Sequence, residues 1–236
     1  MEFMLLFVER KGAPGGTAGG PEAMKAFAAK LARDGTLRRG APLAVESAAA
    51  RVRLHDREPI VRDGPFAESK EVVGGFWIVE AASREDAIDI AARCPHAGRG
   101  IVEVHRVQWR DAVADPGNGT PFLFAFRHEP GLTDPDGAKM REMIEFGNAL
   151  KRDGKFVETA PLARDPVPVR VERRDAKTMV TDGPFTEAKE LVGGYALVRA
   201  ADRAEAVALA GRYPHARWGT VEVREIAFFD RTGVER

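Results

Sequence analysis

The sequence has a single cysteine and no long apolar run. Cys94 has no partner for an internal disulfide, and the position 119 residues later holds a tyrosine, so a matched pair of structural thiols is excluded. The N-terminal apolar run, residues 3–8, is too short for the core of a signal peptide. No segment approaches the roughly 20 apolar residues that a membrane helix needs. We therefore expect a cytoplasmic protein that does not contact a membrane.

The chain also lacks net charge. It carries 36 Lys and Arg against 36 Asp and Glu, and no basic block is longer than three residues. Without a basic stripe interleaved with aromatic residues, nucleic-acid binding is not expected. The glycine-rich stretch 12–20 is not followed by Gly-Lys-Ser/Thr, and no Cys or His spacing resembles a metal-ligand set. We expect neither a cofactor nor a metal.

One stretch of the sequence occurs twice. Residues 61–81 and 180–200 share 13 identities in 21 positions at a constant offset of 119 residues, including Asp-Gly-Pro-Phe and a later Gly-Gly pair. Such a period predicts two copies of one domain. We place the first copy at 1–110, a Pro- and Gly-rich linker at 111–120, and the second copy at 121–236.

Each copy has the same predicted order of elements. An apolar strand is followed by an amphipathic helix, an extended hairpin region that leads into Asp-Gly-Pro-Phe, a strand with the Gly-Gly pair, a helix and a last strand. Glycines within a strand indicate a bulge or a close approach. The order β-α-β-β-α-β is that of ferredoxin-like units in an α+β fold.

The two copies are expected to cover each other. Both helices of such a unit lie on one face of its sheet, so the other face is bare until something packs on it. We predict that the two units pack sheet to sheet within the chain, as an internal pseudo-dimer of the dimeric α+β barrel kind. Assembly of this pseudo-dimer into a homodimer stays open.

The repeated motif resembles a known family. Asp-Gly-Pro-Phe with Glu-x-Lys-Glu and two glycines, then a Cys-Pro-His-Ala or Tyr-Pro-His-Ala turn and Val-Glu-Val, is similar to the YCII-related proteins of the DGPF type. The resemblance covers nearly all of both copies and implies the dimeric α+β barrel fold. It implies little about activity, although some YCII-like proteins are thought to use a His and Asp pair in acid-base chemistry. Those proteins often carry a histidine on the first helix, and this chain has none there.

The motif supplies the first candidate residues. Asp63 and Asp182 could act as general bases, or they could bond backbone amides in the turn. After each aspartate the motif continues with acidic and basic residues that come just before a predicted strand. These could bind an anionic metabolite or form an exposed ion-paired strand end. They are Glu68, Lys70, Glu187 and Lys189.

The last strand of each copy supplies a second pair. Glu103 and Glu222 each stand between two valines, so they lie on the opposite face of the strand from those valines. If the valines face the helices, both glutamates face the space between the sheets, where burial could tune a carboxylate for catalysis. The alternative is a salt bridge to an arginine of the other copy, such as Arg106 or Arg224.

His96 and His215 are the histidines that occur at equivalent positions of both copies. Each follows a proline in the turn before the last strand. They could serve in acid-base catalysis, or they could hold the turn by hydrogen bonds.

Two functional hypotheses follow from these residues. The first is an acid-base enzyme, an isomerase or lyase, acting on a small molecule in the cleft between the sheets. The second is a non-catalytic module in which the same cleft binds a metabolite or a protein partner.

Overall fold

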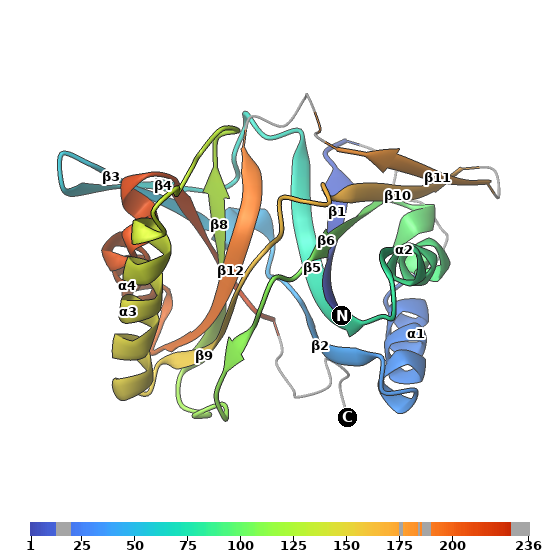
Figure 1. The fold of residues 1–236 in the computed structure, drawn as a ribbon, viewed down its shortest axis with the longest axis horizontal. Coiled ribbons are helices and arrows are strands. Elements are labelled where there is room, and N and C mark those ends of the chain that lie inside the picture. Colours follow the sequence, from blue (N-terminus) through green and yellow to red (C-terminus); the bar gives the residue numbers. More distant parts are fainter. Residues whose placement is uncertain (13–19, 175–176, 184, 186–189, 228–236) are drawn as a thin grey trace.

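The computed structural model describes residues 1–12, 20–174, 177–183, 185 and 190–227. Within these residues the fold is mixed α+β, with two β-sheets and four α-helices. Figure 1 shows the two sheets facing each other in the middle, with α1 and α2 outside one sheet and α3 and α4 outside the other. None of the described helices is both long enough and apolar enough to cross a bilayer.

The first half contains eight main elements, and the helix signals in its sequence are confirmed. Pro21 opens a helix, and Gly35, with φ +70°, follows its end. Ser83 caps the second helix by accepting a hydrogen bond from the amide of Asp86. The elements are β1 (Glu2–Arg10), α1 (Pro21–Arg33), β2 (Leu37–Pro42), β3 (Ala50–His55), β4 (Glu58–Asp63), β5 (Glu71–Glu80), α2 (Arg84–Arg93) and β6 (Ile101–Arg106).

The second half repeats this order after one added strand. Asp202 caps its second helix as Ser83 does in the first half. The added strand falls within the expected linker and pairs with β9. The elements are β7 (Asp111–Ala112), β8 (Thr120–His128), α3 (Ala138–Arg152), β9 (Phe156–Pro161), β10 (Val169–Arg174), β11 (Lys177–Asp182), β12 (Leu191–Ala200), α4 (Arg203–Arg212) and β13 (Thr220–Glu225).

The expected bulges lie at the repeated glycine pairs. On β5, Gly75 pairs with Phe7 whereas Val73 pairs with Val8, so Gly74 is the extra residue. On β12 the register shifts in the same way around Gly193. A Cβ on Gly193 would lie 2.6 Å from Nε2 of His128, so a side chain there would displace that ring.

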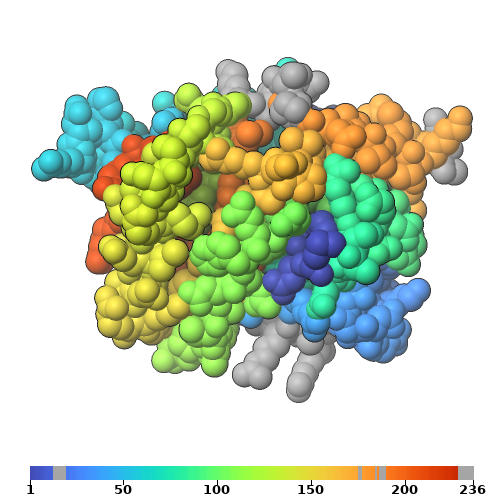
Figure 2. All heavy atoms as spheres, in the orientation of Figure 1, coloured from blue at the N-terminus to red at the C-terminus, as the bar shows by residue number. Residues whose placement is uncertain are grey.

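One hairpin of each half pairs with the sheet of the other half. The strand orders are β11-β10-β6-β1-β5-β2 and β4-β3-β13-β8-β12-β9-β7. Hairpin β3–β4 therefore extends the second half's sheet through β13, and hairpin β10–β11 extends the first half's sheet through β6. Figure 2 shows the same exchange, with light-blue β3–β4 beside red and yellow segments and orange β10–β11 beside green ones.

Three apolar clusters hold these layers together. Two lie between a sheet and its helices, and both include hairpin residues from the other half, Val169 and Val171 in one and Ala50 and Val52 in the other. The third lies between the sheets. Its members come from both halves and include Met4, Leu6, Phe76, Ile78, Leu123, Val157, Tyr195 and Leu197.

Some equivalent positions of the two halves contact each other. The rings of Phe76 and Tyr195, which are 119 positions apart, lie 6.2 Å from centroid to centroid. Arg39 and Glu158 are also equivalent positions, and their Nε and Oε2 atoms lie 2.7 Å apart. Glu158 is fully buried and also accepts a hydrogen bond from the hydroxyl of Tyr195.

Candidate functional site

A large cleft opens between the two sheets at the end where the exchanged hairpins lie. Its volume is about 1360 Å³. One wall comes from β1, β6 and β10, and the other from β3, β4, β8 and β12. Ligand pockets typically measure about 300–1,000 Å³, so this cleft can hold a small molecule with room for solvent.

Glu103 faces this cleft, as strand alternation predicts. Its neighbours Val102 and Val104 belong to the cluster under the helices, so the carboxylate lies on the opposite face of β6. Directly across from it on β10 is Arg170 of the other half, whose Nη2 lies 2.8 Å from Oε1 of Glu103. Arg170 also bonds Glu71, again at 2.8 Å.

His105, two residues further along β6, is hydrogen-bonded to the same carboxylate. Its Nε2 lies 3.0 Å from Oε2 of Glu103, and its ring is buried at the cleft wall. Burial alone would raise the pKa of Glu103, but the hydrogen bond from His105 and the charge of Arg170 lower it to about 2. The ionised carboxylate accepts, so Nε2 donates. No described residue forms a hydrogen bond with Nδ1.

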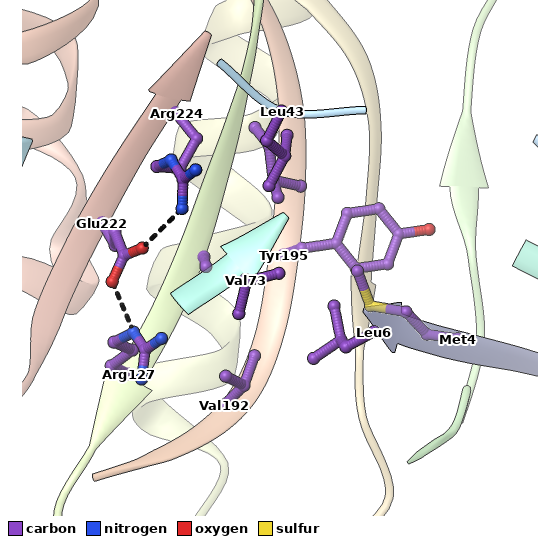
Figure 3. Close-up of a pocket in the computed structure, with 11 residues that line it drawn as sticks. Met4, Leu6, Leu43, Val73, Arg127, Val192, Tyr195, Glu222 and Arg224 are labelled. Carbon is purple, nitrogen blue, oxygen red and sulfur yellow. Dashed lines mark hydrogen bonds and ion pairs between the residues drawn. The ribbon is translucent and has the colours of Figure 1, made fainter. Parts of the chain in front are cut away.

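The equivalent carboxylate of the second half has a different set of partners. Glu222 lies 2.7 Å from Arg127, 3.1 Å from Arg51 and 3.4 Å from Arg224. Burial opposes ionisation, but the three guanidinium charges lower the pKa of Glu222 to about 2. Figure 3 shows Glu222 between Arg224 and Arg127. These residues line a small cavity of about 10 Å³ together with Met4, Leu6 and Tyr195.

The two carboxylate sites have therefore diverged. His105 is equivalent to Arg224, and Val8 of the first half is equivalent to Arg127 of the second. Of these two carboxylates, only that of Glu103 is hydrogen-bonded to a histidine of the described residues. Each glutamate forms a salt bridge to an arginine of the other half, as the alternative interpretation predicts. The arginine is Arg170 for Glu103 and Arg51 for Glu222, not Arg224 or Arg106.

The Asp-Gly-Pro-Phe motif lies at the junction between halves. Asp63 pairs with Arg203 at the start of α4, and Asp182 pairs with Arg84 at the start of α2, at 2.6 Å. Both aspartates are exposed, with 68% of each side chain accessible, and neither lines the cleft. These partners are arginine side chains; among the described residues no backbone amide donates to either carboxylate, so the turn-bonding alternative stays a prediction.

The phenylalanine of each motif copy lies against the arginine that pairs with the glutamate of the other half. Arg51 lies 3.9 Å from the centre of the Phe66 ring, and Arg170 lies 4.3 Å from that of Phe185. Stacking on an aromatic face orients a guanidinium group without using its hydrogen bonds. The motif thereby orients both inter-half ion pairs.

The charged residues after the motif are described in the first half only. Glu68 and Lys70 line the cleft, and Glu68 lies 3.6 Å from Arg51. Glu187 and Lys189 lie outside the described residues.

His96 and His215 lie away from the cleft lining. Nε2 of His96 donates to the carbonyl oxygen of Val8 at 3.1 Å, and that of His215 donates to the carbonyl oxygen of Arg127 at 2.8 Å. Burial lowers the pKa of His96 and lowers that of His215 to about 4, so both rings are neutral at pH 7. Each ties its turn to the first strand of its half.

Sequence reasoning missed His105 because it considered only histidines present in both copies. One signal was available: His105 stands two residues from Glu103, which places both on the same face of one strand. Arg51 and Arg170 do occupy equivalent positions, but only the strand register shows that each faces a glutamate of the other half. Within the described residues, no group of three or more His, Cys, Asp or Glu side chains is arranged to hold a metal.

Comparison with known proteins identifies both halves. The family model for the YCII-related domain matches residues 1–110 and again residues 120–230. A protein of Rhizobium meliloti (strain 1021), described as uncharacterised, is 41% identical over 68 residues. That match covers 29% of this chain and 55% of the relative.

Proposed function

Because this chain belongs to the YCII-related family, with two copies of the domain facing one cleft, we propose that it is an acid-base enzyme for a small molecule. The observation that carries the proposal is the Glu103–His105 pair at the cleft wall. A buried histidine held by a carboxylate, with its second nitrogen unbonded, is the arrangement that proton transfer requires.

In this proposal His105 transfers the proton and Glu103 positions it. A carboxylate with a pKa of about 2 is too weak a base for proton abstraction near pH 7, so Glu103 fixes the ring and stabilises its charged form. Arg170 keeps Glu103 ionised. The reaction class is proton abstraction at a carbon next to a carbonyl, followed by return of the proton to another carbon in an isomerase or by loss of a leaving group in a lyase.

The same features support a fold proposal. We propose that each half is a ferredoxin-like unit and that the two form an intramolecular dimeric α+β barrel. The β6-β1-β5-β2 order and the apolar cluster between the sheets support it. In this arrangement the cleft is the open end of the space between the sheets.

The second candidate is a non-catalytic metabolite-binding module. Glu222 favours it, because a carboxylate held by three arginines is committed to ion pairing and cannot exchange protons near pH 7. If His105 served only to complete a similar ion pair around Glu103, the cleft would bind its ligand without chemistry.

Proton exchange with solvent separates the two candidates. The protein would be incubated in D2O with a panel of small 2-oxo acids, lactones and enol-forming acids, and deuterium entering carbon-hydrogen bonds would be followed by proton NMR. We expect exchange into at least one compound class with the parent. The His105→Gln variant, which keeps a donor to Glu103 but has no basic nitrogen, should lose it.

The control is His55→Gln, because His55 also lines the cleft but is exposed near the hairpin end. Exchange that persists in His105→Gln would refute His105 as the proton-transfer group. Saturable binding of a compound without exchange in the parent would favour the binding module.

A further inference from the structure

The wall of the cleft formed by hairpin β3–β4 carries three basic side chains without partners. Arg53 on β3, Arg62 on β4 and Lys70 after the motif all line the cleft. Arg62 lies directly opposite Arg51 in the hairpin, on the cleft-facing side of the strands. No described residue forms a hydrogen bond or ion pair with the side chains of Arg53, Arg62 or Lys70.

The equivalent hairpin of the second half does not repeat this charge. The positions matching Arg53 and Arg62 hold Glu172 and Thr181. Glu172 is itself neutralised, because it lies 2.8 Å from Arg10 and 3.0 Å from Arg174. At these two positions the second half therefore has a paired acid and a neutral residue, whereas the first half has two arginines that line the cleft.

None of the acidic side chains that line the cleft forms a described ion pair with these three cations; Glu129 and Glu190 are among them, and Glu190 accepts a hydrogen bond from Thr220. Glu71 and Glu103 are paired with Arg170. Glu68 lies 3.6 Å from Arg51, which already bonds Glu222.

We propose that Arg53, Arg62 and Lys70 form a subsite for an anionic group of the ligand, a phosphate or a carboxylate. The inference rests on the proposed function, because it places the ligand's anionic end at this subsite and its reacting end at His105. The guanidinium groups offer paired donors that match carboxylate and phosphate oxygens, and Lys70 adds a compact charge. The substrate is thereby assigned to small acids or phosphate esters.

The test measures anion binding directly, with inorganic phosphate and succinate as probes, by calorimetry and by amide NMR titration at low and high salt. The test variant is Arg53→Glu/Arg62→Thr, which installs the residues of the second half. The matched control is Arg173→Gln, which also removes positive charge from a hairpin but is not a cleft residue. Thermal unfolding verifies that each variant is folded.

We expect the parent to bind at least one probe, more weakly at high salt, and the test variant to lose affinity by about tenfold or more. Arg173→Gln should stay within about twofold of the parent. Tighter binding of phosphate would assign phosphate esters, and tighter binding of succinate would assign carboxylates. Absence of saturable binding by the parent, or equal affinity in the test variant, would overturn the subsite.

The result is separable from that of the proposed function. His105→Gln should leave phosphate or succinate binding intact, since it is not part of the subsite. If deuterium exchange is absent but anion binding depends on Arg53 and Arg62, the enzyme proposal fails and the subsite stands. If exchange depends on His105 while Arg53→Glu/Arg62→Thr binds anions like the parent, the subsite fails and the enzyme proposal stands.

Discussion

At the scale of single residues, the two carboxylate sites differ mainly in the side chain two positions further along the strand. Glu103 has His105 there, and Glu222 has Arg224. Histidine can gain and lose a proton near neutral pH, whereas arginine stays charged. In the proposed function this difference lets the first site transfer protons, whereas the second site, which also has Arg127 in place of Val8, balances charge.

Glu222 should therefore be a major determinant of stability. In Glu222→Gln, Arg51, Arg127 and Arg224 keep their charges without the carboxylate that compensates them. Breaking a buried pair by removing one partner costs about 3–5 kcal/mol. Denaturant titration at pH 7 should show a loss of this size in the free energy of unfolding.

The matched control is Glu58→Gln, the same change at an exposed site on β4. It should alter the unfolding free energy by less than about 0.5 kcal/mol. A Glu222→Gln variant as stable as this control would show that the arginine cluster does not depend on the carboxylate.

His215 should make stability depend on pH in a defined window. Burial lowers its folded-state pKa from 6.5 to about 4, so below pH 6.5 the unfolded chain binds the proton that the folded chain refuses. The contribution is present above pH 6.5 and is lost as the pH falls toward 4. It amounts to on the order of 3 kcal/mol at most.

His215→Gln keeps a donor for the carbonyl of Arg127 but cannot titrate. Urea midpoints measured between pH 7 and pH 4 should fall less steeply for this variant than for the parent. Parallel curves for the two proteins would show that His215 is not buried as a neutral ring.

The direction of the two glutamates could be predicted from the sequence, but the partners of these side chains could not. Alternation with valines is local, so it shows which face Glu103 occupies. The partner Arg170 is 67 residues away and reaches Glu103 only because a hairpin crosses between halves. His105 was missed because only histidines present in both copies were considered, whereas the two carboxylate sites have diverged.

At the scale of elements, the glycine of the motif is more tightly packed in the first half than in the second. A Cβ on Gly64 would overlap the carbonyl oxygen of Glu46, whereas one on Gly183 would lie 3.1 Å from that of Pro168. Overpacking of this kind costs about 1–3 kcal/mol. Gly64→Ala should therefore destabilise the protein clearly more than Gly183→Ala.

The two alanine variants control each other, because they make one change at equivalent turns. Thermal unfolding of both measures the difference. Equal losses would show that the backbone around Glu46 yields as readily as that around Pro168.

Most elements follow from local signals, and the hairpin exchange does not. Pro21, Ser83, Asp202 and the glycine pairs each determine a helix start or a bulge through nearby atoms alone. Hairpin β3–β4 has the same alternating pattern whichever sheet it joins. Its choice of β13 depends on packing against the other half's helices, which periodicity does not report.

At the scale of the whole molecule, the exchange makes each half dependent on the other. The helix-side core of each half includes apolar residues from the other half's hairpin. Residues 1–117 produced alone should therefore be unfolded or aggregated, and mixing with residues 118–236 should restore a folded complex.

Size-exclusion chromatography with light scattering, together with amide NMR spectra of the fragments alone and mixed, checks this. An intact chain nicked in the linker at Gly117 is the control and should stay folded. A monomeric 1–117 fragment with dispersed amide signals would contradict the prediction.

The Arg39–Glu158 contact has a consequence for the pairing of the two halves. In a symmetric dimer of identical halves, a position on the two-fold axis faces its own copy, so an arginine would oppose an arginine. Opposite charges at such a position require that the two sides differ in sequence, as the two halves of this chain do. A homodimer made from either half alone would place two arginines or two glutamates against each other there.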